Sequence, residues 1–139
     1  MHKIFCSLVS VFTVIALGFL SRTPVFYDAE GQVTYYCNKK NSNCTIVTVD
    51  SDYVENFRKL RNVKGECVEN ADEEYVKKTL SRLNAKKRLT ECVDGVVCDY
   101  YYSPAIKESV VIAGKRVNVH VAKRLGGYAI ATPMIFGSC

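Results

Sequence analysis

Cysteine and histidine are the side chains whose chemistry must be settled first, because thiols can be oxidised, bind metals or act as nucleophiles. The 139 residues include 7 cysteines and 2 histidines. Cys6 lies in an apolar N-terminal segment, where it would pack as a small hydrophobic residue. The other cysteines are Cys37, Cys44, Cys67, Cys92, Cys98 and Cys139. An even number of cysteines in a translocated domain is typical of a disulfide framework, and these residues are our disulfide candidates.

Metal binding and thiol catalysis are disfavoured by the spacing of the same residues. The sequence contains no Cys-x-x-Cys pair, and the only histidine beyond the N-terminal segment is His120. A zinc site and an activated thiol both need such partners. His120 alternates with valines, so we expect it at the surface, on the polar face of a strand. Nucleotide-binding and hydrolase motifs are also absent. We therefore predict no metal, no cofactor and no enzymatic activity.

Residues 4–20 form an apolar run without a charged side chain, and Lys3 precedes it. This pattern is typical of a secretory signal or a signal anchor. The positive charge in front favours a cytosolic N-terminus, with the rest of the chain outside. We therefore expect residues 1–22 to be a signal anchor or signal peptide, and residues 23–139 to form an extracellular or lumenal domain. Retention of the segment gives a membrane protein, and cleavage gives a secreted one.

The first elements of the domain are predicted to be a β-hairpin. Residues 32–37 and 44–49 are rich in β-branched and aromatic side chains, and a polar run of turn-forming residues separates them. Cys37 and Cys44 would then lie opposite each other, so we favour a disulfide between them. Asn43 begins an Asn-Cys-Thr sequon and is a candidate glycosylation site.

Two helices are predicted next. The first covers residues 52–61, where apolar side chains recur at helical spacing. The second begins at Asn70 with acidic residues in its first turn and ends at Arg88 with basic residues in its last turn, which matches the helix dipole. Gly65 and Cys67 lie between the helices, in what we expect to be a short turn. Because the helix end accounts for the basic cluster and the net charge of +5 is mild, we predict no nucleic-acid binding.

The C-terminal half is predicted to consist of strands. Residues 90–93 and 96–102 flank Asp94-Gly95, which is a strong hairpin signal. A two-residue loop would put Cys92 and Cys98 on opposite faces, and a three-residue loop would put them on one face, so the disulfide connectivity stays open. Further strands are expected at residues 109–113, 116–122 and 128–132. Together these elements predict an α+β fold: a small disulfide-stabilised domain with an antiparallel sheet and two helices, behind an N-terminal apolar helix.

Tyrosines provide the candidate interface. Tyr35, Tyr36, Tyr100, Tyr101 and Tyr102 lie in predicted strands, and tyrosine is favoured at protein interfaces. They could equally complete a core that lacks tryptophan. With chemistry disfavoured, we expect a membrane-anchored ectodomain that acts by protein–protein recognition, with other membrane or envelope proteins as partners. The alternative is a secreted disulfide-rich effector or inhibitor.

A short apolar N-terminus, a compact outer domain and a particular C-terminal pattern occur together in this chain. The pattern consists of Val-Ala-Lys at 121–123, Gly-Tyr-Ala-Ile at 127–130 and Pro-Met-Ile-Phe-Gly at 133–137. In these features the sequence resembles the 19-kDa per os infectivity factor of baculoviruses and related large insect DNA viruses. The resemblance implies a virion-envelope protein that belongs to a multi-protein entry complex and is needed for oral infection of the midgut. It assigns no binding residue.

Overall fold

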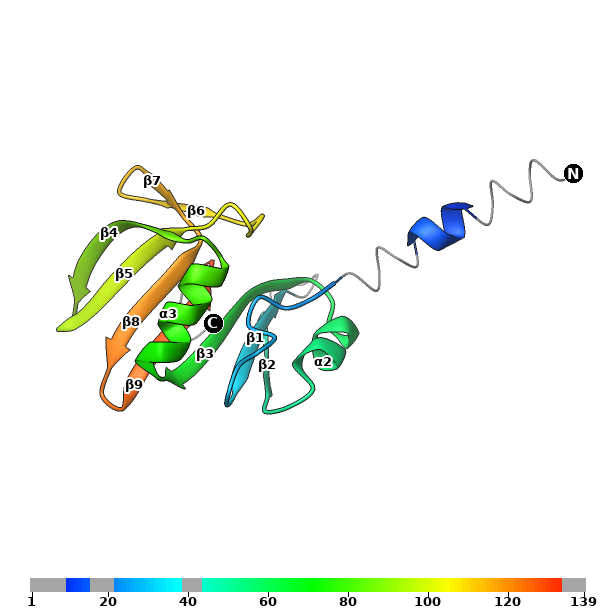
Figure 1. The fold of residues 1–139 in the computed structure, drawn as a ribbon, viewed down its shortest axis with the longest axis horizontal. Coiled ribbons are helices and arrows are strands. Elements are labelled where there is room, and N and C mark those ends of the chain that lie inside the picture. Colours follow the sequence, from blue (N-terminus) through cyan, green and yellow to red (C-terminus); the bar gives the residue numbers. More distant parts are fainter. Residues whose placement is uncertain (1–9, 16–21, 39–43, 134–139) are drawn as a thin grey trace, which may run out of the picture.

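A computed structural model of the chain describes residues 10–15, 22–38 and 44–133. In these ranges the chain folds into an antiparallel sheet with strand order β2-β1-β3-β9-β8-β5-β4, accompanied by a small hairpin (Figure 1). The sheet is formed by β1 (Val33–Asn38), β2 (Cys44–Val49), β3 (Val63–Ala71), β4 (Lys86–Val93), β5 (Val96–Tyr102), β8 (Val119–Arg124) and β9 (Gly127–Thr132). The hairpin is formed by β6 (Val110–Ile112) and β7 (Lys115–Val117), and the helices are α2 (Tyr53–Lys59) and α3 (Glu73–Arg82).

The predicted α+β class is wrong, because the fold is mostly β. The segment expected to be a short turn between the helices is β3, which pairs with both β1 and β9. Its residues Gly65 to Val68 are buried on both faces, so the strand lacks the alternation that would mark it. The charge of Glu66 also interrupts its apolar pattern. The strand was therefore not predicted from the sequence, because a residue that is usually charged is buried in its centre.

The second predicted helix is also shorter than expected. Asp72 caps α3, and its carboxylate accepts a hydrogen bond from the Tyr75 amide at 2.6 Å. The helix ends at Arg82 because Asn84 adopts a left-handed conformation, with φ of 48°. The Asn84 amide then donates to the Ser81 carbonyl, and the Ala85 amide to the Leu80 carbonyl, which is a Schellman cap. The basic residues that follow therefore belong to β4.

In the described part of the N-terminal segment, the predicted apolar helix is not seen at its expected length either. Helix is described in that region for residues 10–15 alone. Among the residues that the structure describes, no helix has the length and apolar character needed to cross a membrane.

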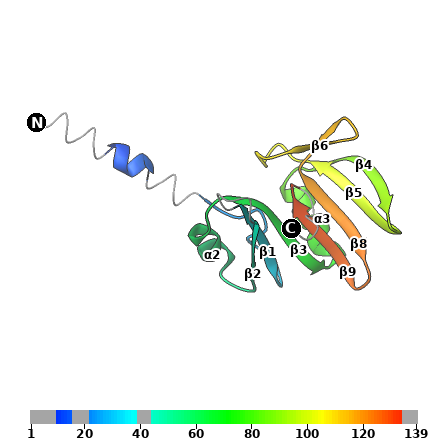
Figure 2. The ribbon, with the colours of Figure 1, turned by 180° about the vertical axis from the view of Figure 1, so that it is seen from behind.

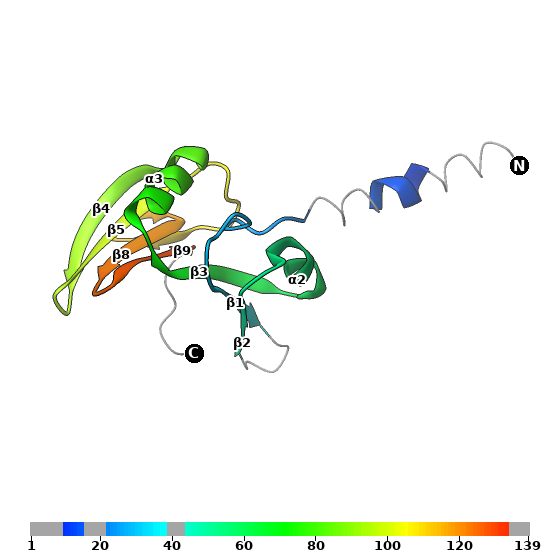
Figure 3. The same ribbon diagram turned by 60° about the horizontal axis from the view of Figure 1, so that its bottom comes forward.

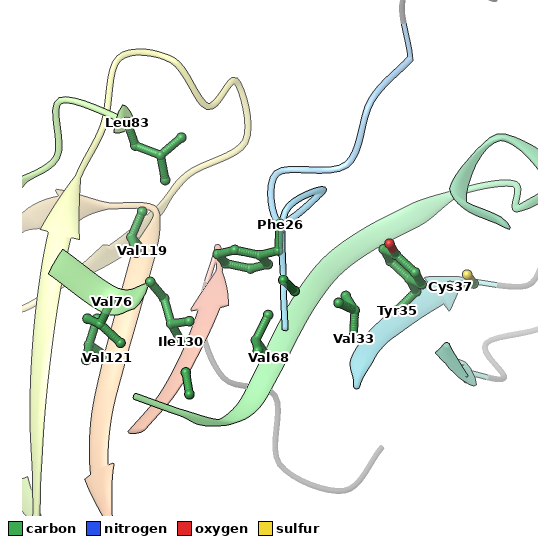
Figure 4. Packing of buried hydrophobic residues seen from close by; sticks show 12 residues of the cluster. Phe26, Val33, Tyr35, Cys37, Val68, Val76, Leu83, Val119, Val121 and Ile130 are labelled. Carbon is green, nitrogen blue, oxygen red and sulfur yellow. The ribbon is translucent and has the colours of Figure 1, made fainter. Parts of the chain in front are cut away.

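The main core lies between the sheet and α3, which crosses β3, β9 and β8 on one side (Figures 1 and 3). Val76 of α3 lies beside Val121 and Ile130 of the sheet, and Leu83, which directly follows the helix, lies nearest Val119 in the same buried cluster (Figure 4). Residues 22–30, which we call the strap, run between α3 and α2 and place Phe26 in this core with no exposed surface (Figures 3 and 4). The strap therefore closes the core where the two helices do not meet.

The other side of the sheet, viewed in Figure 2, carries a second cluster. Val117 of β7 packs there with Cys98 and Tyr100 of β5 and with Ala122 of β8. Because both faces are covered, β8 is buried from Val119 to Ala122. The expectation that His120 lies at the surface is therefore wrong. Its ring stacks on Tyr100 with centroids 4.4 Å apart, and 7% of the residue is exposed.

Candidate functional site

The predicted disulfide framework is not formed by the described cysteines. No disulfide joins any two of Cys37, Cys44, Cys67, Cys92 and Cys98. The strand register gives the reason for the favoured pair, because Cys37 lies opposite Thr45 while Cys44 lies opposite Asn38. Successive residues of a strand point to opposite faces. Cys37 is accordingly buried, whereas Cys44 is exposed on the other face.

In the β4–β5 hairpin, too, the strand register keeps two cysteines apart. The hairpin predicted at Asp94-Gly95 is confirmed, and because Val93 pairs with Val96 its loop contains two residues. Cys92 then lies opposite Val97 and Cys98 opposite Glu91, which puts the two sulfur atoms on different faces. Of the two loop geometries considered, the structure has the one that prevents a bridge.

The buried thiols are poor nucleophiles in this fold. Burial raises the pKa of Cys67 to about 12, with the Glu69 carboxylate contributing. Burial also raises the pKa values of Cys37 and Cys98. These thiols therefore stay protonated near neutral pH. Within the described ranges, no three His, Cys, Asp or Glu side chains gather as a metal site would require.

Three sequence-predicted features lie outside the described residues. They are the cysteines Cys6 and Cys139 and the sequon residue Asn43.

The tyrosines divide into buried and accessible groups. Tyr35 has no exposed surface and packs on Phe57 with ring centroids 5.5 Å apart, and Tyr100 is stacked on His120. These two rings therefore belong to the interior. The partly exposed members of the predicted set are Tyr36, Tyr101 and Tyr102.

The two edges of the sheet differ in a way that matters for binding. β2 ends the described sheet on one side and has the sequence CTIVTV, with no charged residue and no proline. β4 ends it on the other side and carries Lys86, Lys87, Arg88 and Glu91 together with a bulge between Lys87 and Leu89. Charges and bulges are the means by which edge strands avoid pairing with other chains. β4 is protected in this way, and β2 is not.

We call the outer edge of β2, together with the side chains that flank it on both faces, the β2 edge site. These side chains are Tyr36, Ile46, Val47, Leu60 and Arg61. On one face Ile46 is 51% exposed and lies opposite Tyr36 of β1. On the other face a groove of about 380 Å³ is lined by Val47, by Leu60 and by Arg61 among others. A strand added to β2 would direct alternate side chains to these two faces. The site therefore offers backbone pairing with a distinct contact for each face, which is the arrangement used in β-strand addition.

The strap is held to the sheet by a buried acid that sequence reasoning did not single out. Glu66 of β3 is 5% exposed, and its carboxylate accepts hydrogen bonds from the Val25 amide at 2.8 and 3.0 Å and from the Phe26 amide at 3.2 Å. Burial raises the pKa of Glu66 to about 7, against the opposing effect of those amides and of Arg82. Arg82 in turn donates to the Val25 carbonyl at 2.8 Å and to Asp28 at 3.2 Å. The sequence gives no local signal for this role, because Glu66 stands between Lys64 and Glu69 like any other charged residue of the segment.

The start of the strap is attached to α2. The Arg58 side chain donates to the Arg22 carbonyl at 3.3 Å, and the Arg22 guanidinium lies 5.4 Å from the centre of the Phe57 ring. Arg22 also donates to the Leu60 carbonyl at 3.4 Å. The chain is thus fixed to the domain from Arg22 onward.

Comparison of this chain with protein-family models, with curated proteins and with solved structures found no match.

Proposed function

We propose that this protein is an ectodomain directed to a membrane by its N-terminal apolar segment, and that it acts by protein–protein recognition through the β2 edge site. The observation that carries the proposal is the contrast between the sheet edges, because β2 alone of the two described edges lacks charges and a bulge. Exposed strand edges without such protection pair readily with another chain. The partner is then a protein that supplies an extended segment.

The chemistry of the edge suggests what this segment contains. Ile46 and Tyr36 present partly exposed apolar surface on one face of the strand. Arg61 lies at the groove on the other face and forms no salt bridge within the described residues. A complementary strand would place an apolar residue against Ile46 and an acidic residue near Arg61.

Support for the membrane part of the proposal comes from the N-terminal segment. Val11, Phe12, Val14 and Ile15 are between 55% and 75% exposed. Such a run of exposed apolar side chains is unfavourable in water and favourable in lipid. Because Arg22 is already fixed to α2, the domain would be held close to the bilayer. The resemblance to the per os infectivity factor suggests that the partner is another envelope protein in an entry complex.

The test is affinity capture from membranes with the full 139-residue chain, followed by mass spectrometry. We compare the unchanged protein with Ile46→Lys, which adds a charge to the β2 edge. Val93→Lys is the matched control, because Val93 lies on the β4 edge and is 48% exposed against 51% for Ile46. We expect one protein to be captured by the unchanged chain and by Val93→Lys, and lost with Ile46→Lys. Equal capture by all three would contradict recognition through β2.

Membrane attachment is tested separately by carbonate extraction of the expressed protein. We expect the chain to stay in the membrane pellet with residues 1–22 still present at its N-terminus. Release of a protein that starts near Phe19 would contradict anchoring and identify a secreted effector instead.

A further inference from the structure

An open pocket of about 560 Å³ lies at the opposite end of the sheet from the β2 edge site. Lys87 and Arg88 of β4, Tyr102 of β5 and Gly114, Lys115 and Arg116 of the β6–β7 hairpin line it. We call it the basic pocket. The helix dipole does not account for the basic residues at 86–88, because α3 ends at Arg82 and these residues belong to β4. The cluster of cations therefore needs another explanation.

The charges in the basic pocket are only partly balanced. Lys87 forms a salt bridge with Asp99 at 2.9 Å. The Lys115 ammonium donates to the Arg88 carbonyl at 2.9 Å, which satisfies a hydrogen bond without neutralising the charge. Among the described residues, no carboxylate lies within salt-bridge distance of Arg88, Lys115 or Arg116. The pocket thus gathers three uncompensated cations, an arrangement that an anion would stabilise.

The backbone holds these cations in place. The bulge between Lys87 and Leu89 interrupts the regular pairing of β4 at Arg88. Across the pocket, Ala113 and Gly114 form the turn of the β6–β7 hairpin with φ values of 47° and 73°. Both values are positive, as in the tight turns that fix hairpin register. Arg88 and Lys115 are therefore positioned by folded strands on both sides of the pocket, and the Lys115 hydrogen bond joins the two sides.

The size and lining of the pocket indicate the class of ligand. It exceeds the space of one inorganic ion, and the cations at its rim could contact several anionic groups at once. Arg88 lies over the Tyr102 ring at 5.5 Å, so one face of this aromatic side chain is already covered. Nucleic-acid binding surfaces usually present aromatic platforms for bases, and Tyr102 is the aromatic residue in this lining. No aliphatic side chain lines the pocket, which disfavours insertion of lipid.

We propose that the basic pocket binds a sulfated glycan, with sulfate groups held by Arg88, Lys115 and Arg116. We choose a glycan over other polyanions because the proposed function places the domain on the extracellular or lumenal side of the membrane, where sulfated glycans occur. Charge-assisted hydrogen bonds from arginine and lysine to sulfate oxygens would supply most of the affinity. The binding should therefore weaken as salt is added.

The test measures binding of a fluorescent heparin-derived octasaccharide to the full chain in detergent at 150 mM NaCl. The pocket variant is Lys115→Gln/Arg116→Gln. The control is Lys64→Gln/Lys123→Gln, which removes the same charge from exposed lysines of β3 and β8. We expect at least a roughly tenfold weaker affinity for the pocket variant, because each lost charge-assisted bond is worth a factor of that order. The control should stay within about twofold of the unchanged protein, and thermal melting verifies that both variants are folded.

Other results would overturn the proposal. These are absence of octasaccharide binding, equal weakening by both variants, and undiminished binding of the desulfated octasaccharide. Tighter binding of a single-stranded oligonucleotide of equal charge would assign the pocket to nucleic acid. Binding confined to phosphatidylserine vesicles would assign it to a membrane surface, with the 70%-exposed Val111 as the nearby apolar contact. Because the β2 edge lies at the other end of the sheet, Ile46→Lys should leave octasaccharide binding unchanged whether or not it abolishes capture of a protein partner.

Discussion

At the scale of single residues, Glu66 is a buried acid and His120 is a buried base. Burial shifts their pKa values from the ordinary values in opposite directions. Burial raises the pKa of Glu66 from 4.5 to about 7. Burial, together with the nearby Arg124, lowers the pKa of His120 from 6.5 to about 4. Between pH 4.5 and 6.5 the folded protein retains a proton on Glu66 that the unfolded chain releases, while the unfolded chain binds a proton on His120 that the folded protein does not. The two groups therefore give the free energy of unfolding opposite slopes with pH.

Single substitutions should reveal each slope. In Glu66→Gln the effect of His120 remains, so stability should rise by about 3 kcal/mol between pH 4 and 6.5. In His120→Asn the effect of Glu66 remains, so stability should fall by about 3 kcal/mol between pH 4.5 and 7. Urea unfolding at a series of pH values measures both, and the unchanged protein should vary less than either variant where the two ranges overlap. Parallel profiles for all three proteins would mean that neither group is buried as described.

Asn118 is another buried polar residue, and its side chain satisfies buried backbone groups. Its side-chain oxygen accepts from the Ser103 amide at 2.7 Å, and its nitrogen donates to the Ser103 carbonyl at 2.8 Å and to the Ile106 carbonyl at 3.1 Å. We expect Asn118→Ala to lower the free energy of unfolding by about 3 kcal/mol, because buried backbone groups lose their partners. Asn56→Ala is the control, since it removes one exposed hydrogen bond to Ser51 and should cost less than about 1 kcal/mol. Chemical denaturation compares the two variants, and equal losses would contradict this role for Asn118.

At the scale of elements, the junction of β3 with β9 depends on a glycine. Gly127 has φ of 150°, and a Cβ atom there would lie 2.9 Å from the Ala71 carbonyl oxygen. Gly126 also has a positive φ, of 90°, but a Cβ atom there would meet nothing within 4 Å. We expect Gly126→Ala to cost about 1 kcal/mol of backbone strain, and Gly127→Ala to cost about 2 kcal/mol more because the backbone of β3 must move. Thermal melting of both variants tests this, and equal melting temperatures would mean that β3 and β9 are not so close.

At the scale of the whole molecule, the strap marks where the folded domain begins. We expect the strap and the residues after it to stabilise the fold, and the segment before it to contribute little stability. Residues 11–15 expose their apolar side chains, whereas Phe26 and Pro24 of the strap are fully buried. We expect residues 22–139 alone to fold with nearly unchanged stability. Removal of residues 1–30 should cost at least about 4 kcal/mol, because Phe26 leaves a cavity and Glu66 loses its amide partners. Near-UV circular dichroism and urea unfolding of the two truncated chains measure the difference. A similar loss in both would show that the N-terminal segment also stabilises the fold.

Local signals predicted part of this architecture. The hairpin at Asp94-Gly95 and the hairpin of β1 and β2 depend on neighbouring residues, and the structure confirms them. The start of α3 was predicted at Asn70, but Asn70 ends up in β3 and Asp72 caps the helix. β3 was missed because its burial depends on strands distant in sequence and on the strap amides that satisfy Glu66. The end of α3 was missed because basic residues suit a helix terminus as well as a protected edge strand, and Asn84 decides between them.

The candidate sites depended even more on long-range pairing. The sequence of β2 shows an uncharged strand, but only the order of the complete sheet places that strand at an edge. Similarly, Lys115 and Arg116 lie near Arg88 because the β6–β7 hairpin packs beside β4 and β5, which no local pattern indicates. The same holds for the tyrosines expected at an interface. Tyr35 and Tyr100 are buried, because their packing partners Phe57 and His120 come from distant parts of the chain.

The unequal edges of the sheet also limit the stoichiometry of any assembly that β2 forms. Growth of a filament by strand addition needs two open edges on each subunit, so that a subunit pairing on one side can still receive another on the opposite side. Here the charged and bulged β4 edge blocks the second contact. Pairing through β2 therefore ends after one partner, either in a one-to-one complex or in a two-fold dimer of this chain. If β2 binds a partner as proposed, the same sheet prevents that binding from extending into a polymer.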